Sequence, residues 1–390
     1  MGSRKKRRSL DDRPLPQVRG NEIKIGLSMK LSRASKMDFE KTLKKYKEII
    51  DSGLKTLFDE KILDSKDFIK SSYSYLKEFV LRGGKRLRPA ITIMAYKAVC
   101  DQDEKKIFLP AIGIELFHNS SLIHDDIMDE DSERRGMLSM HKYFDKLFLK
   151  DYEEKKYEGR IFRKMSDRFG VSLAILQGDI LYALTENCFT NSPFDAAKIR
   201  KVLDVINRTY RVICEGQMLD IFSELKRDFT ENDYLRVIET KTAHLFRAAI
   251  QVGAIFGSAT ARPLNALSQY AISIGTAFQL QDDLIDVSPG LKGHAFGSDI
   301  RRGKYTLLMI KAFEIASQKQ RQILLSALGN DKADRGMMNA AVEVLYATGA
   351  VDYVKRLARQ KLREGQSCLI NAGLSEEACA FFEGLANFMA

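Results

Sequence analysis

The chain has 390 residues, of which 45% are hydrophobic and 29% charged, so it can bury a large core and is ordinary for a globular protein. Its net charge of +11 is carried mainly by residues 1–36, where eleven basic and three acidic residues leave a surplus of eight, so the nearly neutral remainder argues against a nucleic-acid-binding protein. No apolar run spans a membrane, no signal-peptide pattern opens the chain and no CxxC spacing suggests zinc, so we expect a cytoplasmic protein.

Residues 1–36 contain the basic run Arg4–Arg8, followed by prolines that discourage regular structure. Three interpretations remain open: a disordered extension without a specific role, a patch for weak contact with an anionic membrane surface or nucleic acid, and a targeting signal. We expect a disordered extension, followed by a single domain over residues 37–390.

Two amphipathic helices are predicted over residues 38–83, without any strand pattern. The next segment, Gly-Gly-Lys-Arg-Leu-Arg-Pro at residues 83–89, frees the backbone with glycines and places proline in the first turn of a new helix. Lys85, Arg86 and Arg88 would then lie at a helix N-terminus, which favours anions. A solvated surface charge cluster is the alternative.

An apolar helix predicted from Ile112 to Ile127 ends in an acidic turn. Asp125 and Asp129 lie one helical turn apart on one face, with Asp126 beside them. Three carboxylates on one turn repel one another, and hard oxygen donors with room for phosphate oxygens suit Mg²⁺ better than zinc. Arg134 and Arg135 follow and add positive charge. The pattern favours a site for a metal-bound anion, with a solvated acidic helix end as the alternative.

Residues 142–169 are rich in charges of both signs and in aromatic side chains, and we expect a solvated insertion, with a cap over the site as the alternative. The apolar helix 171–185 should be central. In the helix after it, Gln217 and Asp220 lie one turn apart on a buried stripe. They either hold a catalytic partner in place or form structural hydrogen bonds.

Lys241 and Thr242 interrupt an otherwise apolar helix that is predicted from Thr230 to Ile255. Burying them is costly unless they face an anion or a cation. An exposed lysine is the alternative, because lysines are mostly exposed.

A second acidic turn, with Asp282, Asp283 and Asp286, repeats the spacing of the first on another apolar helix. Two such helices facing each other across a cavity can hold several Mg²⁺ ions around one diphosphate, which a single cluster cannot do. The glycine-rich basic loop 297–306 follows, and Lys304 in it could close over phosphate. The helices after residue 307 carry no identified chemistry.

Together these segments resemble the trans-isoprenyl diphosphate synthase (polyprenyl synthetase) family over residues 37–390. Six separated signals occur in the family's order: GGKRLRP, DDIMD followed by RRG, GD in the central helix, EGQMLD, KTA, and FQLQDDLID followed by GSDIRRGK. The resemblance implies an all-α helical bundle around a central cavity, usually as a homodimer. It also implies a prenyltransferase that joins an allylic diphosphate to isopentenyl diphosphate by ionisation, condensation and proton loss.

The resemblance assigns roles to individual residues. Mg²⁺, expected as three ions with bound diphosphate, would be held by the acids of both turns: Asp125, Asp126, Asp129, Asp282, Asp283 and Asp286. Lys241, Lys304 and Arg134 would hold the leaving diphosphate, while Thr242 and Gln279 present oxygens to the allylic cation. The metal-free pocket for isopentenyl diphosphate would use four side chains: Lys85, Arg88, His118 and Arg135.

Product length is expected to depend on side chains before Asp125 on the same helix face. In family members that stop at fifteen carbons, aromatic side chains fill the positions occupied here by Ser120 and Ser121. These serines are small, and Phe117 is the predicted floor. We therefore expect a geranylgeranyl (C20) product, with a longer polyprenyl product (C25 or more) as the alternative.

One departure and two rivals qualify the resemblance. Where the family commonly has Gly-Lys, this chain has Gly293-His294, which predicts a more pH-dependent diphosphate site. A class I terpene cyclase pairs the first acidic motif with a different, Asn/Ser/Glu-type motif, and a non-catalytic subunit usually loses an acidic cluster. Because both clusters are present, a catalytic synthase is the favoured interpretation.

Overall fold

The computed structural model describes residues 33–390, except 155–156, 158, 160, 227 and 289–295. This part of the chain is helical apart from one hairpin of two short antiparallel strands, which confirms the predicted all-α class. The elements in chain order are α1 (Arg33–Leu63), α2 (Asp67–Leu81), α3 (Leu87–Lys97), η1 (Glu104–Ile107), α4 (Phe108–Met128), β1 (Glu133–Arg134), β2 (Met137–Leu138), α5 (Met140–Asp151), α6 (Met165–Thr190), α7 (Ala196–Ser223), α8 (Glu231–Ile238), η2 (Glu239–Ala243), α9 (His244–Phe256), α10 (Ala261–Asp286), α11 (Ser298–Arg302), α12 (Leu307–Ile315), α13 (Gln318–Ala327), α14 (Arg335–Ala347), α15 (Ala350–Cys368) and α16 (Glu376–Phe388).

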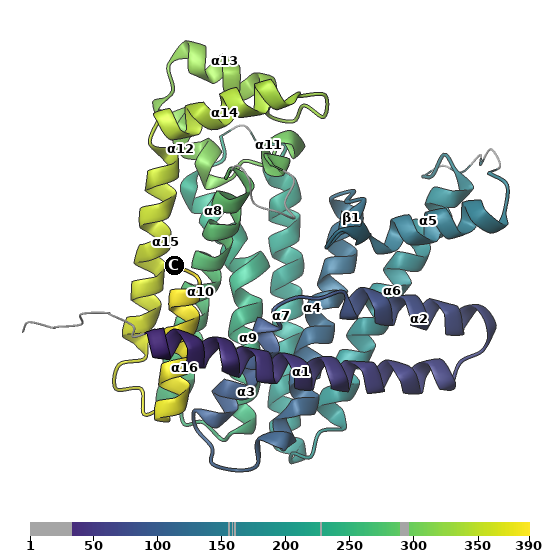
Figure 1. Ribbon diagram of the computed structural model, residues 1–390, viewed down its shortest axis with the longest axis vertical. Helices are drawn as coiled ribbons and strands as arrows, with labels where there is room; N and C mark the ends of the chain where they lie inside the picture. Colours follow the sequence, from purple (N-terminus) through teal and green to yellow (C-terminus); the bar gives the residue numbers. More distant parts are fainter. Residues whose placement is uncertain (1–32, 155–156, 158, 160, 227, 289–295) are drawn as a thin grey trace, which may run out of the picture.

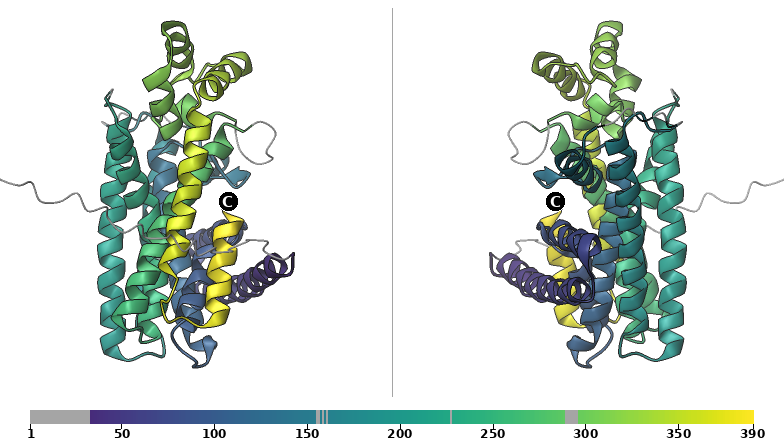
Figure 2. Two further views of the ribbon diagram at one scale, coloured as in Figure 1. Left: turned by 90° about the vertical axis from the view of Figure 1, so that its left-hand side faces the viewer. Right: turned by 90° about the vertical axis from the view of Figure 1, so that its right-hand side faces the viewer.

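The body of the molecule is a bundle in which α4, α6, α7, α9 and α10 run in roughly the same line, with α1 crossing them (Figure 1). One hydrophobic core joins these helices, and it includes fully buried Leu116 of α4, Ala249 of α9 and Ile274 of α10. The helix that the sequence predicted to be central, α6, packs along α4 and α5 but lies at one edge of the bundle (Figure 2), with Ile175 and Leu176 exposed, so that prediction is wrong. Burial of these apolar faces is the main stabilising contribution, since each large apolar side chain contributes about 1.5–3 kcal/mol when fully buried.

A second, smaller core covers one end of the bundle, where α12, α13 and α14 extend beyond the other helices (Figures 1 and 2). It contains Leu308 of α12 and Val354 of α15, together with Tyr234 of α8 and Leu284 of α10. Because α8 and the end of α10 belong to this core, the second acidic turn is anchored on it.

Two glycines of the predicted motifs set how closely helices approach at the site. A Cβ on Gly216 of α7 would lie 2.6 Å from the backbone nitrogen of Lys241, and one on Gly178 of α6 would clash with the imidazole of His124. A side chain at position 216 would push the backbone of Thr240 and Lys241 away, whereas one at position 178 would displace the His124 ring.

The helix predicted from Thr230 to Ile255 is interrupted. Thr230 caps α8 as expected, in a capping box with Asp233, but Glu239–Ala243 then form a π turn before α9. Such turns occur frequently at functional sites, and this one carries Lys241.

Several predictions concern the ends and insertions of the chain. The boundary predicted between residues 36 and 37 lies within α1, which begins at Arg33, and residues 1–32 and His294 lie outside the described part. Residues 142–169 form most of α5, a connection and the first turn of α6. Among the described residues, no helix is long and apolar enough to cross a membrane.

Candidate active site

The first acidic turn meets the two predicted lysines at the end of α4. Lys241 Nζ lies 3.0 Å from Asp125 Oδ1 and 2.6 Å from Asp220 Oδ2. Lys304 Nζ lies 2.9 Å from Asp129 Oδ2 and 3.8 Å from Asp220 Oδ2. We call Asp125, Asp129, Asp220, Lys241 and Lys304 the acid–lysine cluster. It joins four segments, α4, α7, η2 and the loop after α11.

The charges in the acid–lysine cluster stabilise one another. Burial opposes the charged form of Asp129, but Lys304 and Lys241 outweigh burial and lower its pKa. Burial also opposes the charged form of Lys241, and Asp125 and Asp220 outweigh it and raise the pKa of this lysine. Asp129 and Lys241 are therefore held in their ionised forms by their partners.

The second acidic turn is connected to the same place by a line of hydrogen bonds. Thr242 Oγ1 donates to Gln279 Oε1 at 2.9 Å, and Gln279 Nε2 donates to Asp283 Oδ1 at 3.1 Å. The Tyr234 hydroxyl donates to the other oxygen of Asp283. Asp283 is buried, whereas its neighbour Asp282 is exposed. Both oxygens of Asp283 thus have protein donors.

Asp286 also has protein donors on both oxygens. Its Oδ1 accepts from the backbone N and the Oγ of Ser298, at 2.9 and 2.6 Å, and its Oδ2 accepts from the backbone N of Asp299 at 3.2 Å. Burial and the neighbouring Asp286 raise the pKa of Asp299 to about 7, and Lys304 opposes this rise. Lys304, which binds Asp129 of the first acidic turn, is therefore also within electrostatic range of Asp299, the backbone partner of Asp286.

Asp126 is bound by Arg134 of the β hairpin, which also lies 3.9 Å from Asp125 of the cluster. It is fully buried and accepts a hydrogen bond from Arg134 Nε at 2.7 Å. Burial raises its pKa to about 6 against the attraction of Arg134. Asp131 forms an ion pair with Arg134 at 3.4 Å and another with Arg302 of α11. These two ion pairs connect the β hairpin to α11.

The donor set fits Mg²⁺ that arrives with a diphosphate. The available ligands are carboxylate oxygens, and the buried Oδ2 of Asp126 has no hydrogen-bond partner among the described residues. Within the same part of the chain, no three acids, histidines or cysteines converge into a preformed metal cage. Mg²⁺ commonly uses one or two carboxylates and completes its shell with phosphate oxygens and water, which suits acids spread over two helices.

Three of the four residues predicted for isopentenyl diphosphate gather near the start of α3. Arg88 Nη1 lies 3.3 Å from His118 Nε2, and the Arg88 guanidinium lies 4.5 Å from the centre of the Phe246 ring. Arg135 donates to the carbonyl of Gly83 at 2.8 Å. We call Arg88, His118 and Arg135 the basic cluster.

Within the described part of the chain, the arginines of the basic cluster have no carboxylate in direct contact, and Glu115, which attracts both, is paired with Arg86. Burial lowers the pKa of Arg88 to about 10, and burial together with Arg88 and Arg135 holds the pKa of His118 well below its usual value. Among the described residues, neither arginine forms an ion pair with a carboxylate, and Arg88 Nε has no hydrogen-bond partner. Lys85, the fourth predicted residue, lies 4.4 Å over the ring of Phe388 in α16.

Arg86, between Lys85 and Arg88 in sequence, turns the other way. It is 3% exposed, and its guanidinium binds Asp51 at 2.7 Å, Glu115 at 2.5 Å and the carbonyl of Val80 at 2.8 Å. The basic heptapeptide is therefore divided between an internal anchor and an anion site.

Comparison with known proteins shows which family has this arrangement of residues. The polyprenyl synthetase family model matches residues 69–345. The chain belongs to this family. It is 36% identical over 299 residues to the geranylgeranyl diphosphate synthase of Methanosarcina mazei, a match that covers 76% of this chain and 82% of that protein. Other matched relatives have longer-chain names, geranylfarnesyl and octaprenyl diphosphate synthase. The predicted prenyltransferase is confirmed at the level of the family.

Solved structures support the same assignment. The geranylgeranyl pyrophosphate synthetase of Pyrococcus horikoshii superposes with a TM-score of 0.75 at 30% identity, covering 90% of this chain and 98% of that one. The geranylgeranyl pyrophosphate synthase of Corynebacterium glutamicum, a complex with isoprenyl diphosphate and magnesium, gives a TM-score of 0.81 at 27% identity, covering 89% and 98%. This polyprenyl synthetase therefore has the all-α fold that its motifs predicted.

The predicted floor of the product channel lies among aromatic side chains. Phe117 is fully buried, and its ring centre lies 5.9 Å from that of Tyr182 on α6 and 5.8 Å from that of Tyr210 on α7. Tyr182 and Tyr210 stack on each other at 4.4 Å. Three helices of the synthetase thus contribute to one aromatic cluster.

The two predicted wall serines have different surroundings. Ser120 is fully buried and donates to the carbonyl of Gly178 on α6 at 2.9 Å. Ser121 is partly buried and donates to the carbonyl of His118 within its own helix at 2.8 Å. Ser120 therefore packs against α6, one turn from Phe117.

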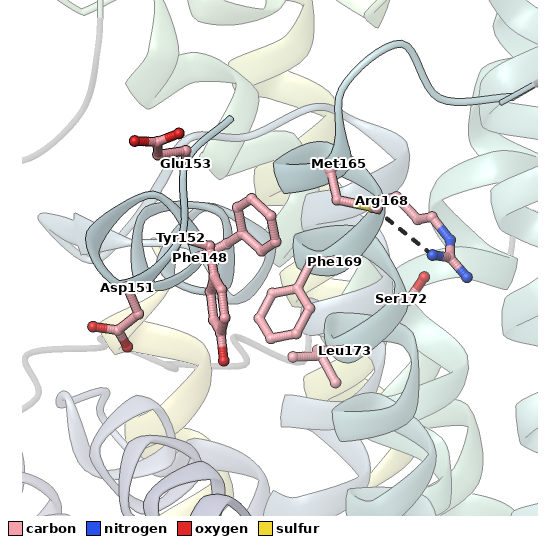
Figure 3. Close-up of a pocket in the computed structure, with 9 residues that line it drawn as sticks. All are labelled: Phe148, Asp151, Tyr152, Glu153, Met165, Arg168, Phe169, Ser172 and Leu173. Carbon is pink, nitrogen blue, oxygen red and sulfur yellow. Dashed lines mark hydrogen bonds between the residues drawn. The ribbon is translucent and has the colours of Figure 1, made fainter. Parts of the chain in front are cut away.

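A separate pocket of about 620 Å³ lies between the end of α5 and the start of α6 (Figure 3). Phe148, Tyr152, Phe169 and Leu173 provide apolar walls, and Arg168 lies at the α6 side. None of the predicted site residues lines it. The insertion at 142–169 thus contributes to a pocket of its own.

The sequence interpretation missed Tyr234 and Asp299. Tyr234 precedes Lys241 by seven residues, a spacing that places two side chains on the same helical face, so this signal was present. Asp299 stands in the GSD of the last motif, but nothing in its local sequence indicates that Asp286 would accept from its backbone.

Proposed function

We propose that this polyprenyl synthetase condenses isopentenyl diphosphate with an allylic diphosphate and releases geranylgeranyl diphosphate (C20) as its main product. The observation that carries the proposal is the presence of two differently built anion regions, the acid–lysine cluster and the basic cluster, in one site. Two diphosphates can then be bound in two ways, one with metal and one without.

The acid–lysine cluster suits the allylic diphosphate. Asp125, Asp126 and Asp129 of α4 and Asp282 of α10 would hold Mg²⁺, expected as three ions, while Asp283 and Asp286, which accept hydrogen bonds from protein groups on both oxygens, would orient their neighbours. Bound Mg²⁺ would neutralise the diphosphate and make it a better leaving group. Lys241 and Lys304 would then exchange their carboxylate partners for phosphate oxygens, with Arg134 at the hairpin.

The basic cluster suits isopentenyl diphosphate. A partly buried guanidinium without a carboxylate is costly unless an anion binds it, and Arg88 is in this position. Arginine forms bidentate contacts with phosphate, and neutral His118 can donate from a ring nitrogen. Lys85 and Arg135 would complete the pocket from the glycine-rich loop and the hairpin.

The allylic cation that forms on ionisation would be stabilised by oxygens of Thr242 and Gln279, which lie between the two acidic turns. Oxygen dipoles fixed before the reaction stabilise developing positive charge without reorganisation. No side chain is assigned as the final base, and the released diphosphate would take the proton.

The C20 product is supported by small residues at 120 and 121 and by the aromatic cluster of Phe117, Tyr182 and Tyr210. A growing chain that passes the serines would stop at these rings. A product of C25 or more is the second candidate, because relatives with longer-chain names match the sequence as well.

We also propose that the synthetase is a homodimer through α6 and α7, which lie along one edge of the bundle (Figure 2). Their outer faces expose large apolar side chains: Ile175, Leu176, Met218, Ile221, Phe222 and Leu225. Such a continuous face is typical of a subunit interface. Light scattering of wild type and Met218→Lys/Phe222→Lys should give a dimer and a monomer, respectively; equal masses would exclude this face.

Residues 1–36 would be available for weak contact with an anionic membrane surface while the enzyme works in the cytoplasm. Their surplus of eight positive charges supports this proposal. Deletion of residues 1–32 should reduce sedimentation with anionic vesicles and leave prenyl transfer unchanged. Equal vesicle binding by both proteins would contradict it.

One assay tests the reaction. Purified protein with Mg²⁺ and radiolabelled isopentenyl diphosphate would be given allylic primers of five, ten and fifteen carbons, and the products would be sized by chromatography. We expect a C20 product that disappears when Mg²⁺ is chelated. Absence of prenyl transfer with every primer would refute the proposed function.

A further inference from the structure

Four side chains form a hydrogen-bond line from α8 to the π turn. Tyr234 donates to Asp283, Gln279 donates to the other oxygen of Asp283 through Nε2, and Thr242 donates to Gln279 Oε1. Tyr234 comes from α8, Asp283 and Gln279 from α10, and Thr242 from η2. The line thus crosses from the smaller core to the reacting centre.

The atoms in contact set the direction of the bonds in this line. Gln279 Nε2 lies 3.1 Å from Asp283 Oδ1 and Gln279 Oε1 lies 2.9 Å from Thr242 Oγ1, so the amide presents its NH₂ group to Asp283 and its oxygen to Thr242. The Thr242 hydroxyl must then use its proton on Gln279. The lone pairs of the Thr242 oxygen then face away from Gln279. Without Asp283, the Gln279 amide could turn over.

Tyr234 holds Asp283 in this role. The phenol is 5% exposed and sits in the smaller core, so its hydroxyl has a fixed position from which it donates to Asp283. Burial and the charge of Asp299 raise the pKa of Asp283, and the hydrogen bonds from Tyr234 and Gln279 oppose this rise because they favour the charged form. With one protein donor on each oxygen, Asp283 is held in place from two helices, α8 and α10.

We propose that Tyr234 and Asp283 are positioning residues that set the polarity of the Thr242–Gln279 pair, so that oxygen lone pairs and not protons face the allylic cation. This inference rests on the proposed function, because it gives the polarity a purpose in ionisation. Reversing the amide would aim the Thr242 proton at the developing positive charge and oppose ionisation.

Tyr234→Phe removes the first donor without changing the size of the ring. We expect kcat to fall by about tenfold or more, as is typical for residues that orient an active-site group, with the KM for isopentenyl diphosphate unchanged. Tyr353→Phe is the matched control. Tyr353 of α15 donates to Glu231 of α8 at 2.8 Å, so it also binds the helix that carries Tyr234 but takes no part in the hydrogen-bond line. The control should retain the wild-type kcat.

A pair of variants tests the polarity itself. In Asp283→Asn only one of the two terminal atoms can accept a hydrogen bond, so either Tyr234 or Gln279 can no longer donate to position 283, and both kcat and Tm should fall. In Asp283→Asn/Gln279→Glu the net charge is that of the wild type, and the new carboxylate at position 279 again accepts from Thr242. We therefore expect this double variant to recover kcat and Tm toward the wild-type values.

The outcomes separate the inference from the proposed function. The Tm measured without substrate tests the direction of the hydrogen bonds between positions 242, 279 and 283. This test remains valid even if the protein has another activity. Equal Tm and kcat for the single and double variants would overturn the polarity argument. A higher Mg²⁺ concentration for half-maximal activity in Tyr234→Phe, with kcat unchanged at saturation, would assign Asp283 to metal binding instead.

Discussion

The acid–lysine cluster and the basic cluster both suit a diphosphate, but they hold their charges in opposite ways. In the first, Lys241 and Lys304 lie within 3.0 Å of carboxylates that already neutralise them. In the second, Arg88 and Arg135 form no ion pair among the described residues, and His118 is held neutral by burial and their charge.

The difference explains why one diphosphate would need metal and the other would not. An anion approaching the acid–lysine cluster meets carboxylates as well as lysines, so divalent cations must first occupy the carboxylates. An anion approaching the basic cluster meets two arginines and a neutral histidine, and Glu115, the carboxylate that attracts both arginines, is already paired with Arg86. The same contrast separates Arg86, bound to two carboxylates, from Arg88 two residues later.

The largest expected effect concerns stability and separates Arg86 from Arg88. Arg86→Met leaves buried Glu115 without its ion-pair partner, and removing one partner of a buried ion pair costs about 3–5 kcal/mol of unfolding free energy. Arg88→Met removes a charge that no carboxylate of the described residues contacts directly and should leave stability nearly unchanged. Urea unfolding measures both, and equal midpoints would remove the distinction.

The next effect concerns catalysis in the acid–lysine cluster. Lys304→Met removes a cation that stabilises the departing diphosphate, and kcat should fall by about 10²–10³-fold. Lys311→Met is the control, since Lys311 of α12 pairs with Glu231 at 2.7 Å, outside the cluster. Steady-state kinetics in saturating substrate would test it. A similar loss in both variants would indicate a general structural effect.

In the basic cluster the expected change is in substrate binding. Arg88→Met should raise the KM for isopentenyl diphosphate by about 10–100-fold, because a charge-assisted hydrogen bond contributes roughly 1.5–3 kcal/mol. The KM for the allylic substrate should change little, since the acid–lysine cluster is intact. A comparable rise in both KM values would contradict the assignment of two separate regions.

A smaller effect on rate, but a visible one on product, is expected at the aromatic cluster. Phe117→Ala opens the floor formed with Tyr182 and Tyr210 and should give products longer than C20. Ser120→Phe should shorten the product to C15, and Ser120→Ala, which only removes the bond to Gly178, should leave it unchanged. Unaltered chain length in the first two variants would refute the wall assignment.

The smallest effect is a pH dependence of stability. The pKa of His118 is lowered on folding, so below about pH 6.5 the unfolded chain binds a proton that the folded chain does not, and stability falls as the pH decreases. In His118→Gln this loss is absent. The difference in Tm between pH 7.5 and pH 5.5, measured by calorimetry, should therefore be smaller than in the wild type; identical differences would exclude a neutral His118.

The sequence alone determined the helical class, the two acidic turns and the identity of most charged residues at the site. Helical periodicity sets which side chains share a face, so Asp125 and Asp129, or Gln217 and Asp220, could be paired from spacing. The same local rule missed the π turn at Glu239–Ala243, because the close approach of Gly216 to Lys241 involves two distant segments.

Only the tertiary structure decided which charges are anchors and which are available to a ligand. Arg86 and Arg88 are the same residue type two positions apart, but Arg86 is bound by carboxylates from α1 and α4. In the same way, the hydrogen-bond partners of Asp283 come from α8 and from α10 itself. A hydrogen bond or an ion pair forms between atoms about 3 Å apart, whatever their separation along the chain. Spacing in sequence therefore predicts the members of the site, and packing assigns their roles.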